Sequence, residues 1–170
     1  MSKRTIIVLG VSTGGPKLLR SFVDGMPRLN AALILVQHMP KFMNHRFCGA
    51  IDALTDMDAT VGVDGQIVEP GTICMALSEM HLKLMGNTRV RLIDGPKVCF
   101  VRPSVDVTMM SLAAKPGDRI IGVVLTGMGS DGSDGVTHIK SIGGATIAQD
   151  EASSVVWGMP GSAVATGHVD

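Results

Sequence analysis

The feature that constrains the fold most is a series of short apolar runs that each end in a polar or glycine-rich turn. Two of these runs occupy residues 5–11 and 32–37, a third occupies residues 119–126, and a shorter fourth occupies residues 145–148. Their lack of apolar–polar alternation is typical of strands buried on both faces of a parallel sheet. Helical patterns separate the runs. The sequence therefore predicts an α/β fold, a doubly wound and mainly parallel sheet flanked by helices.

The helices are predicted from apolar stripes and from residues that favour helix ends. Pro16 follows two glycines at a suitable first helical position, with an apolar stripe behind it, and Ser104 is a suitable N-cap. We expect further helices at residues 42–54, around residues 136–142 and after Pro160.

The middle of the chain, residues 61–99, is divided into short runs by glycine, proline and aspartate turns. Gly86-Asn87 lies between two of these runs, residues 81–85 and 88–93, and this arrangement is typical of a hairpin. We therefore expect an antiparallel section within the otherwise parallel architecture.

Composition excludes several classes of function. The 170 residues suit one domain, residues 1–170, and 15 basic residues balance 15 acidic ones, which argues against nucleic-acid binding. No apolar run is long enough for a signal peptide or a membrane span, so we expect a cytoplasmic protein without membrane insertion. The three cysteines, Cys48, Cys74 and Cys99, lack metal-site spacing, and we expect buried free thiols and no metal.

Three of the expected strands end in side chains that are able to carry chemistry. The first strand leads to Ser12, the second to His38, and the third to a glycine-rich loop that contains Asp131. In open parallel sheets the ligand site lies outside the carboxyl ends of the strands. A nucleophile, a base and a carboxylate are therefore predicted at one edge of the sheet.

Residues 10–14, GVSTG, match the nucleophile elbow G-x-S-x-G. The motif alone is weak, because a glycine-rich turn of this kind also cradles phosphate. The order serine, histidine, aspartate disfavours an ordinary α/β-hydrolase, in which the acid precedes the histidine. Three other carboxylates compete with the one in the glycine-rich loop, namely those of Asp106, Asp134 and Asp150. Four other histidines are interpreted as structural: His45, His81, His138 and His168; for His81 a place at the border of the cleft stays open.

Several motifs in register resemble one family, the chemotaxis protein-glutamate methylesterases (the CheB family). They are GVSTGG at residues 10–15, QHMP at 37–40, RPSVDV at 102–107, LTGMGSDG at 125–132, AQDEAS at 148–153 and GMP at 158–160. The resemblance runs from residue 7 to the end of the chain.

The resemblance implies a serine esterase that uses no cofactor. Ser12 would be the nucleophile, His38 the base and Asp131 the triad acid, with the backbone amides of Thr13 and Met128 in the oxyanion hole. The implied substrate is the methylated helical cytoplasmic region of a chemoreceptor, and deamidation of glutamine side chains is a neighbouring activity of the family.

The sequence also departs from the family pattern. Residues 76–80 replace a stretch that usually contains proline and glycine, and relatives tend to continue with a further helix. The usual N-terminal receiver domain is not present in the 170 residues, so we expect constitutive activity without a response to a phosphodonor, or control by a separate receiver domain. Two alternatives stay open: an esterase of the same chemistry that acts on a non-chemotactic protein, and a non-catalytic phosphate- or nucleotide-binding module.

Overall fold

The computed structural model describes residues 3–170, and the first two residues of the expected domain lie outside this range. Six strands form one sheet in the order β3-β4-β2-β1-β7-β8, and every neighbouring pair is parallel. Their bounds are β1 Arg4–Val11, β2 Ala31–Gln37, β3 Asp58–Val61, β4 Thr72–Met75, β7 Asp118–Val124 and β8 Ala145–Ala148. The predicted fold class is confirmed.

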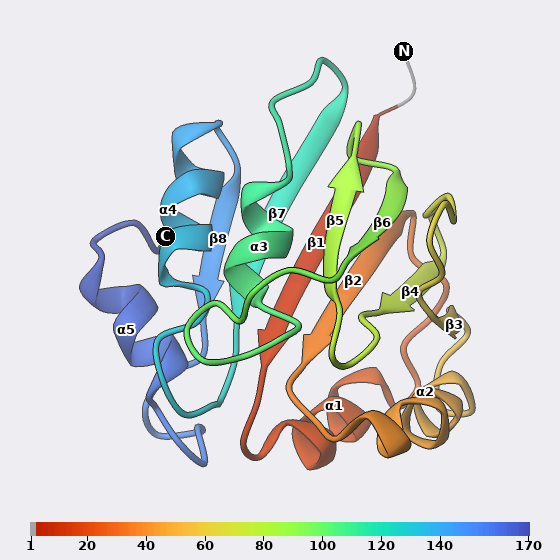
Figure 1. Ribbon diagram of the computed structural model, residues 1–170, viewed down its shortest axis with the longest axis horizontal. Helices are drawn as coiled ribbons and strands as arrows, with labels where there is room; N and C mark the ends of the chain where they lie inside the picture. The colour runs from red at the N-terminus through yellow and green to blue at the C-terminus, as the bar shows by residue number, and fades with distance from the viewer. Residues whose placement is uncertain (1–2) are drawn as a thin grey trace.

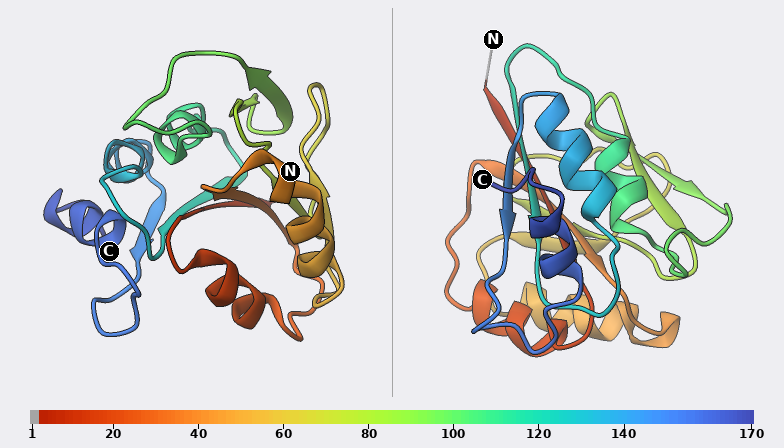
Figure 2. Two further views of the ribbon diagram at one scale, coloured as in Figure 1. Left: turned by 60° about the horizontal axis from the view of Figure 1, so that its bottom comes forward. Right: turned by 90° about the vertical axis from the view of Figure 1, so that its left-hand side faces the viewer.

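The sheet separates two hydrophobic cores, and different elements cover its two faces (Figures 1 and 2). On one face lie α1 (Gly15–Val23) and α2 (Asn44–Asp52), and the 3-10 turn η1 (Lys41–Met43) directly precedes α2. The other face carries α3 (Val105–Met110), α4 (Ser133–Ser141), α5 (Met159–Ala165) and the antiparallel pair β5 (His81–Met85) and β6 (Arg89–Ile93). Within residues 3–170, no helix is both long and apolar enough to span a membrane.

The central strands explain why the apolar runs lack alternation. All seven residues of β2 are buried, because its side chains alternate between the two cores. Ile34 packs into the core with the hairpin and α3, and its neighbour Leu35 packs into the core with α1 and α2. Covering both faces of a parallel strand removes the polar side that an antiparallel strand would expose to water.

The middle of the chain differs from the expectation in one respect. The hairpin over residues 81–93 is confirmed, but β3 and β4 belong to the parallel sheet, and β4 lies between β3 and β2. The expectation of an antiparallel section therefore holds only for β5 and β6. Each missed strand has only four residues, too few for a clear period, and its parallel partner is distant in sequence.

Strand order determines where the site forms. β1 pairs with β2 on one side and with β7 on the other, so the carboxyl ends of these three strands lie side by side. Val11 is paired with Gln37, and Gly10 with Val124. Ser12, His38 and the loop after β7 consequently leave the same edge of the sheet, as the sequence predicts.

Candidate active site

Ser12 lies in a tight turn between β1 and α1. Its amide donates to the carbonyl of Thr126 (2.9 Å), and its own carbonyl accepts from the amide of Gly15 (2.8 Å). Gly14 has a φ of 85°, and a Cβ built on it would lie 2.7 Å from the Cβ of Val155. Gly127 supports the turn from the side, because a Cβ there would lie 2.8 Å from the Cβ of Ser12. Only glycine fits either position without displacing its neighbours.

His38 and Asp131 are in direct contact. The Nε2 atom of His38 lies 2.9 Å from Oδ2 of Asp131, and both side chains are largely buried. A carboxylate is acceptor-only, so Nε2 carries the proton in this bond and Nδ1 of the neutral ring keeps a free lone pair. Among residues 3–170, neither Nδ1 of His38 nor the hydroxyl of Ser12 has a hydrogen-bond partner. Hydrogen bonds of this kind often form only when the substrate is bound.

The Asp131 carboxylate is held by four donors. Oδ1 accepts from the Ser104 hydroxyl (2.9 Å) and the Asp106 amide (3.0 Å), and Oδ2 accepts from the Val105 amide (2.7 Å) and from His38. Burial alone would raise the pKa of Asp131. The bonds from His38 and from the two amides outweigh burial, and the pKa lies below its ordinary value. The side chain is thus kept ionised and fixed in orientation.

Backbone amides near the turn are available to an anion. The amides of Thr13 and Met128 donate no hydrogen bond to any residue of the range 3–170. Thr126 holds the peptide that follows Thr13, because its hydroxyl contacts the carbonyls of Thr13 (3.0 Å) and Val156 (3.2 Å). Gln149 accepts from the Thr126 amide at 2.7 Å, which links this loop to the end of β8.

Gln37 connects the two strand ends that carry Ser12 and His38. Its side-chain Nε2 donates to the carbonyl of Ser12 (3.1 Å) and to that of His38 (2.9 Å). Sequence reasoning missed this role and that of Thr126, although both are polar residues at the ends of apolar strands. That position is the only signal that could have identified them.

Within residues 3–170, none of the four histidines interpreted as structural forms a hydrogen bond with His38 or Asp131, although His81 bonds to Ser104, a donor to Asp131. His45 lies in α2, and His168 lies near the C-terminal end of the described chain. His138, in α4, contacts the Leu112 carbonyl through Nε2 (2.7 Å). His81 is buried: its Nδ1 accepts from the Ser104 amide (3.1 Å), and its Nε2 lies 2.7 Å from the Pro96 carbonyl.

A cleft of about 340 Å³ opens beside His38. Its walls include Glu79, Lys97 and Arg102, together with Phe100, whose side chain is 95% exposed. The cleft thus combines charges of both signs with an exposed apolar ring, and it adjoins the side of the site where the imidazole lies.

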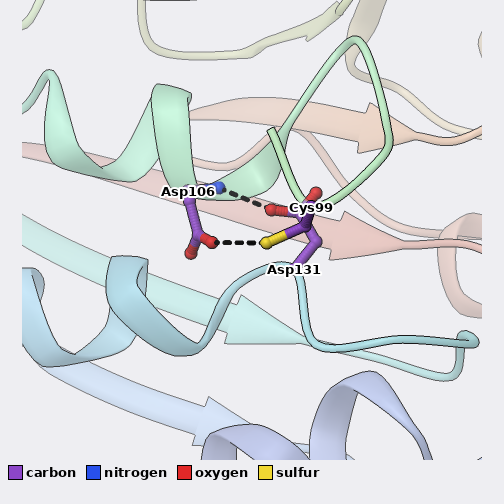
Figure 3. A group of neighbouring side chains, drawn as sticks. All are labelled: Cys99, Asp106 and Asp131. Atoms are coloured by element: carbon purple, nitrogen blue, oxygen red, sulfur yellow. Dashed lines mark hydrogen bonds between the residues drawn. The ribbon is translucent and has the colours of Figure 1, made fainter. Parts of the chain in front are cut away.

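Figure 3 shows Asp131 with the two neighbouring side chains of Cys99 and Asp106. Their ligand atoms lie within 4.8 Å of one another. The Cys99 thiol donates to Oδ2 of Asp106 (3.6 Å), and Oδ1 of Asp106 accepts from the Gly132 and Gly135 amides (2.9 and 2.7 Å). Every carboxylate oxygen is already bonded. Partial desolvation of the Cys99 thiol and the adjacent carboxylates raise its pKa, so the cluster does not fit a metal.

The cysteines only partly match the expectation. Cys48 and Cys74 are free and buried, and burial raises the pKa of their thiols to about 11 and about 12. Cys99 is also free, but it is exposed, so the prediction of a buried residue is wrong for it. It lies in a tight turn closed by Val98 and Val101, where Cys99 and Phe100 both have positive φ. Turn residues lie at the surface, and an apolar residue type does not override that position.

The structure distinguishes the four aspartates that competed for the role of triad acid. Asp131 alone contacts His38, Asp106 is buried behind it, and Asp134 and Asp150 are exposed. Asp150 is fully exposed and bonds to Ser153, which lowers its pKa. Residue patterns alone could not rank them, because the donors to Asp131 come from residues 104–106, and only the family resemblance pointed to Asp131.

Comparison with known proteins gives consistent results. The family model described as CheB methylesterase matches residues 7–170. Protein-glutamate methylesterase/protein-glutamine glutaminase 2 of Rhodospirillum rubrum is 40% identical over 98% of this chain and 47% of its own length. The corresponding protein of Halobacterium salinarum is 41% identical over 96% of this chain and 49% of its own length. The chain thus spans about half the length of these curated relatives.

A solved structure is similar over the whole chain. The crystal structure of the Thermotoga maritima CheB methylesterase catalytic domain superimposes with a TM-score of 0.90 and 34% sequence identity. The match covers 100% of this chain and 91% of the other.

Proposed function

Because the chain belongs to the CheB methylesterase family, we propose that it hydrolyses glutamyl γ-methyl esters on a protein by serine chemistry. The observation that carries the proposal is the bond between His38 and Asp131 at the strand ends next to Ser12. The names of the relatives, each a methylesterase and glutaminase, support the same reaction.

In the proposed mechanism, the Ser12 hydroxyl attacks the ester carbonyl while Nδ1 of His38 takes its proton. Asp131 accepts from Nε2, which keeps the free lone pair on Nδ1, and its negative charge stabilises the imidazolium that forms. The imidazolium then returns the proton to the departing methoxide, and methanol leaves. Water repeats these steps on the acyl-enzyme and restores both glutamate and Ser12.

The oxyanion of each tetrahedral intermediate would be bound by the amides of Thr13 and Met128. These donors are free within residues 3–170, and the Thr126 hydroxyl anchors the peptide next to Thr13. Donors fixed before the reaction stabilise developing charge without any cost of reorganisation.

The proposed substrate is the methylated helical cytoplasmic region of a chemoreceptor. The cleft beside His38, with Phe100 at its exposed rim and charges of both signs, suits a protein surface better than a small apolar ligand. A glutamine side chain presents a similar carbonyl, so its deamidation with release of ammonia is the neighbouring reaction.

Methanol release from a methylated receptor fragment tests this function. Wild-type protein should release methanol, and Ser12→Ala should abolish the release with an unchanged fold, because this side chain lies in a turn rather than in the core. A Ser12→Ala variant that retains most activity would contradict the mechanism. The alternative of a nucleotide-binding module predicts no methanol and a nucleotide-dependent rise in melting temperature. Release from an unrelated methylated protein but not from the receptor fragment would favour a non-chemotactic target.

A further inference from the structure

A second buried carboxylate lies directly behind the one that contacts His38. Asp106, in the first turn of α3, is 3% exposed, and its backbone amide donates to Oδ1 of Asp131 at 3.0 Å (Figure 3). It has no contact with His38 and lines no part of the cleft beside that histidine. Any effect of Asp106 on the chemistry therefore acts without direct contact, through the position of Asp131 or through the charge that Asp106 places behind it.

The Asp106 side chain also fixes the backbone around Asp131. Its Oδ1 accepts from the amide of Gly132, the next residue in the chain, and from the amide of Gly135 in the first turn of α4. One residue thus holds Asp131 from two directions, through its own amide and through the loop that carries it. Hydrogen bonds to an ionised acceptor are stronger than neutral ones, so the charge of Asp106 strengthens its bonds to the Gly132 and Gly135 amides.

The charges around Asp106 are negative or neutral. Asp131 faces it from the loop before α4, Asp134 from α4 and the Cys99 thiol from the preceding turn, and His38 lies beyond Asp131. Within residues 3–170, no lysine or arginine forms an ion pair with Asp106. Burial and then the neighbouring carboxylates raise its pKa to about 6, against the lowering effect of the two amides, so it is mostly ionised at neutral pH.

The adjacent buried carboxylates of Asp106 and Asp131 repel each other in the resting site. During the reaction they gain a favourable partner. When His38 accepts the Ser12 proton, a positive charge appears next to Asp131, and both carboxylates stabilise it. The stabilisation is greater in the transition state than in the ground state, which is the condition for accelerating the chemical step.

We propose that Asp106 is a positioning residue of the esterase site, which holds Asp131 in place and adds a second negative charge behind it. This inference rests on the proposed function. Asp106→Asn is the matching variant, because an amide oxygen still accepts from the Gly132 and Gly135 amides while the charge is lost. We expect kcat to fall roughly tenfold, with KM almost unchanged, since the side chain does not touch the cleft.

The pH profile separates this role from a merely structural one. In wild type, protonation of Asp106 adds to protonation of the His38 base. The acid limb of kcat/KM should therefore become steeper than about one decade per pH unit below about pH 6. In Asp106→Asn, the acid limb of kcat/KM should fit the binding of one proton. Asp134→Asn is the control, because it removes an exposed negative charge from the first turn of α4 and no bond to Asp131 or His38. It should keep the wild-type kcat and the steep acid limb, displaced slightly to lower pH because the charge of Asp134 helps to raise the pKa of Asp106.

Two results would overturn the inference while leaving the esterase function intact: full activity of Asp106→Asn, or an acid limb of unchanged steepness. If wild type releases no methanol, the proposed function fails. The inference about Asp106 is then tested by NMR titration of the His38 ring. The His38 ring resonances should then show a second inflection near pH 6 in wild type and in Asp134→Asn. A second inflection that persists in Asp106→Asn would refute the positioning role.

Discussion

Replacing Asp106 with asparagine should make the protein more stable at neutral pH. Burial and neighbouring charge raise the pKa of this carboxyl from 3.8 to about 6. The folded state therefore binds the proton more tightly than the unfolded chain does. The stability contributed by protonated Asp106 is fully present below about pH 4 and is lost as the pH rises through about 6.

The size of the effect follows from the shift. One pKa unit corresponds to 1.36 kcal/mol, so the shift of about 2 units lowers the free energy of unfolding by roughly 3 kcal/mol at neutral pH. Asparagine avoids this loss and keeps an oxygen for the Gly132 and Gly135 amides. The gain should be about 2–3 kcal/mol at pH 7.5, and the difference between variant and wild type should vanish near pH 4.

Urea unfolding at several pH values measures this difference directly. The other titrating groups are present in both proteins, so they largely cancel when the two free energies of unfolding are subtracted. Asp134→Asn, with its exposed side chain, should change stability by less than about 0.5 kcal/mol. The reasoning is refuted if Asp106→Asn is less stable than wild type at pH 7.5, or if the difference does not depend on pH.

The remaining predictions concern the residues around Ser12. Replacing His38 with alanine should abolish methanol release almost as fully as Ser12→Ala, and the double variant should be little worse, because the members of a triad act as a unit. Additive losses in kcat/KM would contradict this. Asp131→Asn should lower kcat by roughly a thousandfold or more through the wrong imidazole tautomer, whereas Asp134→Asn should not; the reverse result would mean that the acid is misassigned. Gly127→Ala should cost at least about tenfold in kcat and roughly 1–3 kcal/mol in stability, because its Cβ would lie 2.8 Å from that of Ser12 and 2.5 Å from the Met159 sulfur. Wild-type values in kinetics and urea unfolding would show that the turn adapts.

The parts of the fold that could be predicted are those with a strong local signal. β1, β2 and β7 are long apolar runs, and the Gly86-Asn87 turn marks the hairpin between β5 and β6. β4 gave no such signal, because four residues between turns are compatible with a strand or a loop. Its place in the sheet comes from hydrogen bonds to β2 and β3, which parallel pairing draws from distant parts of the sequence.

In the candidate site too, some residues have a local sequence signal and others depend on packing between distant parts of the chain. Ser12 and His38 could be identified because each directly follows a predicted strand, and strand ends are where open sheets bind ligands. The choice of Asp131 over Asp106 depends on which carboxylate reaches His38, and that depends on how α3 packs against α4. Packing between helices from different parts of the chain leaves no local pattern, so the second carboxylate was visible only as one of several competing aspartates.

The pairing of β1 with β7 has a consequence for how the protein is made. Gly10 and Val124 are register partners, so the serine turn gains its neighbour only after the ribosome has synthesised most of the chain. A nascent chain that ends before residue 118 lacks both Asp131 and β7, the strand that flanks β1 on that side. Closing such a long loop is slow compared with forming a helix or hairpin. The onset of hydrolysis during translation or refolding would therefore report completion of the sheet, whereas helix content would rise earlier.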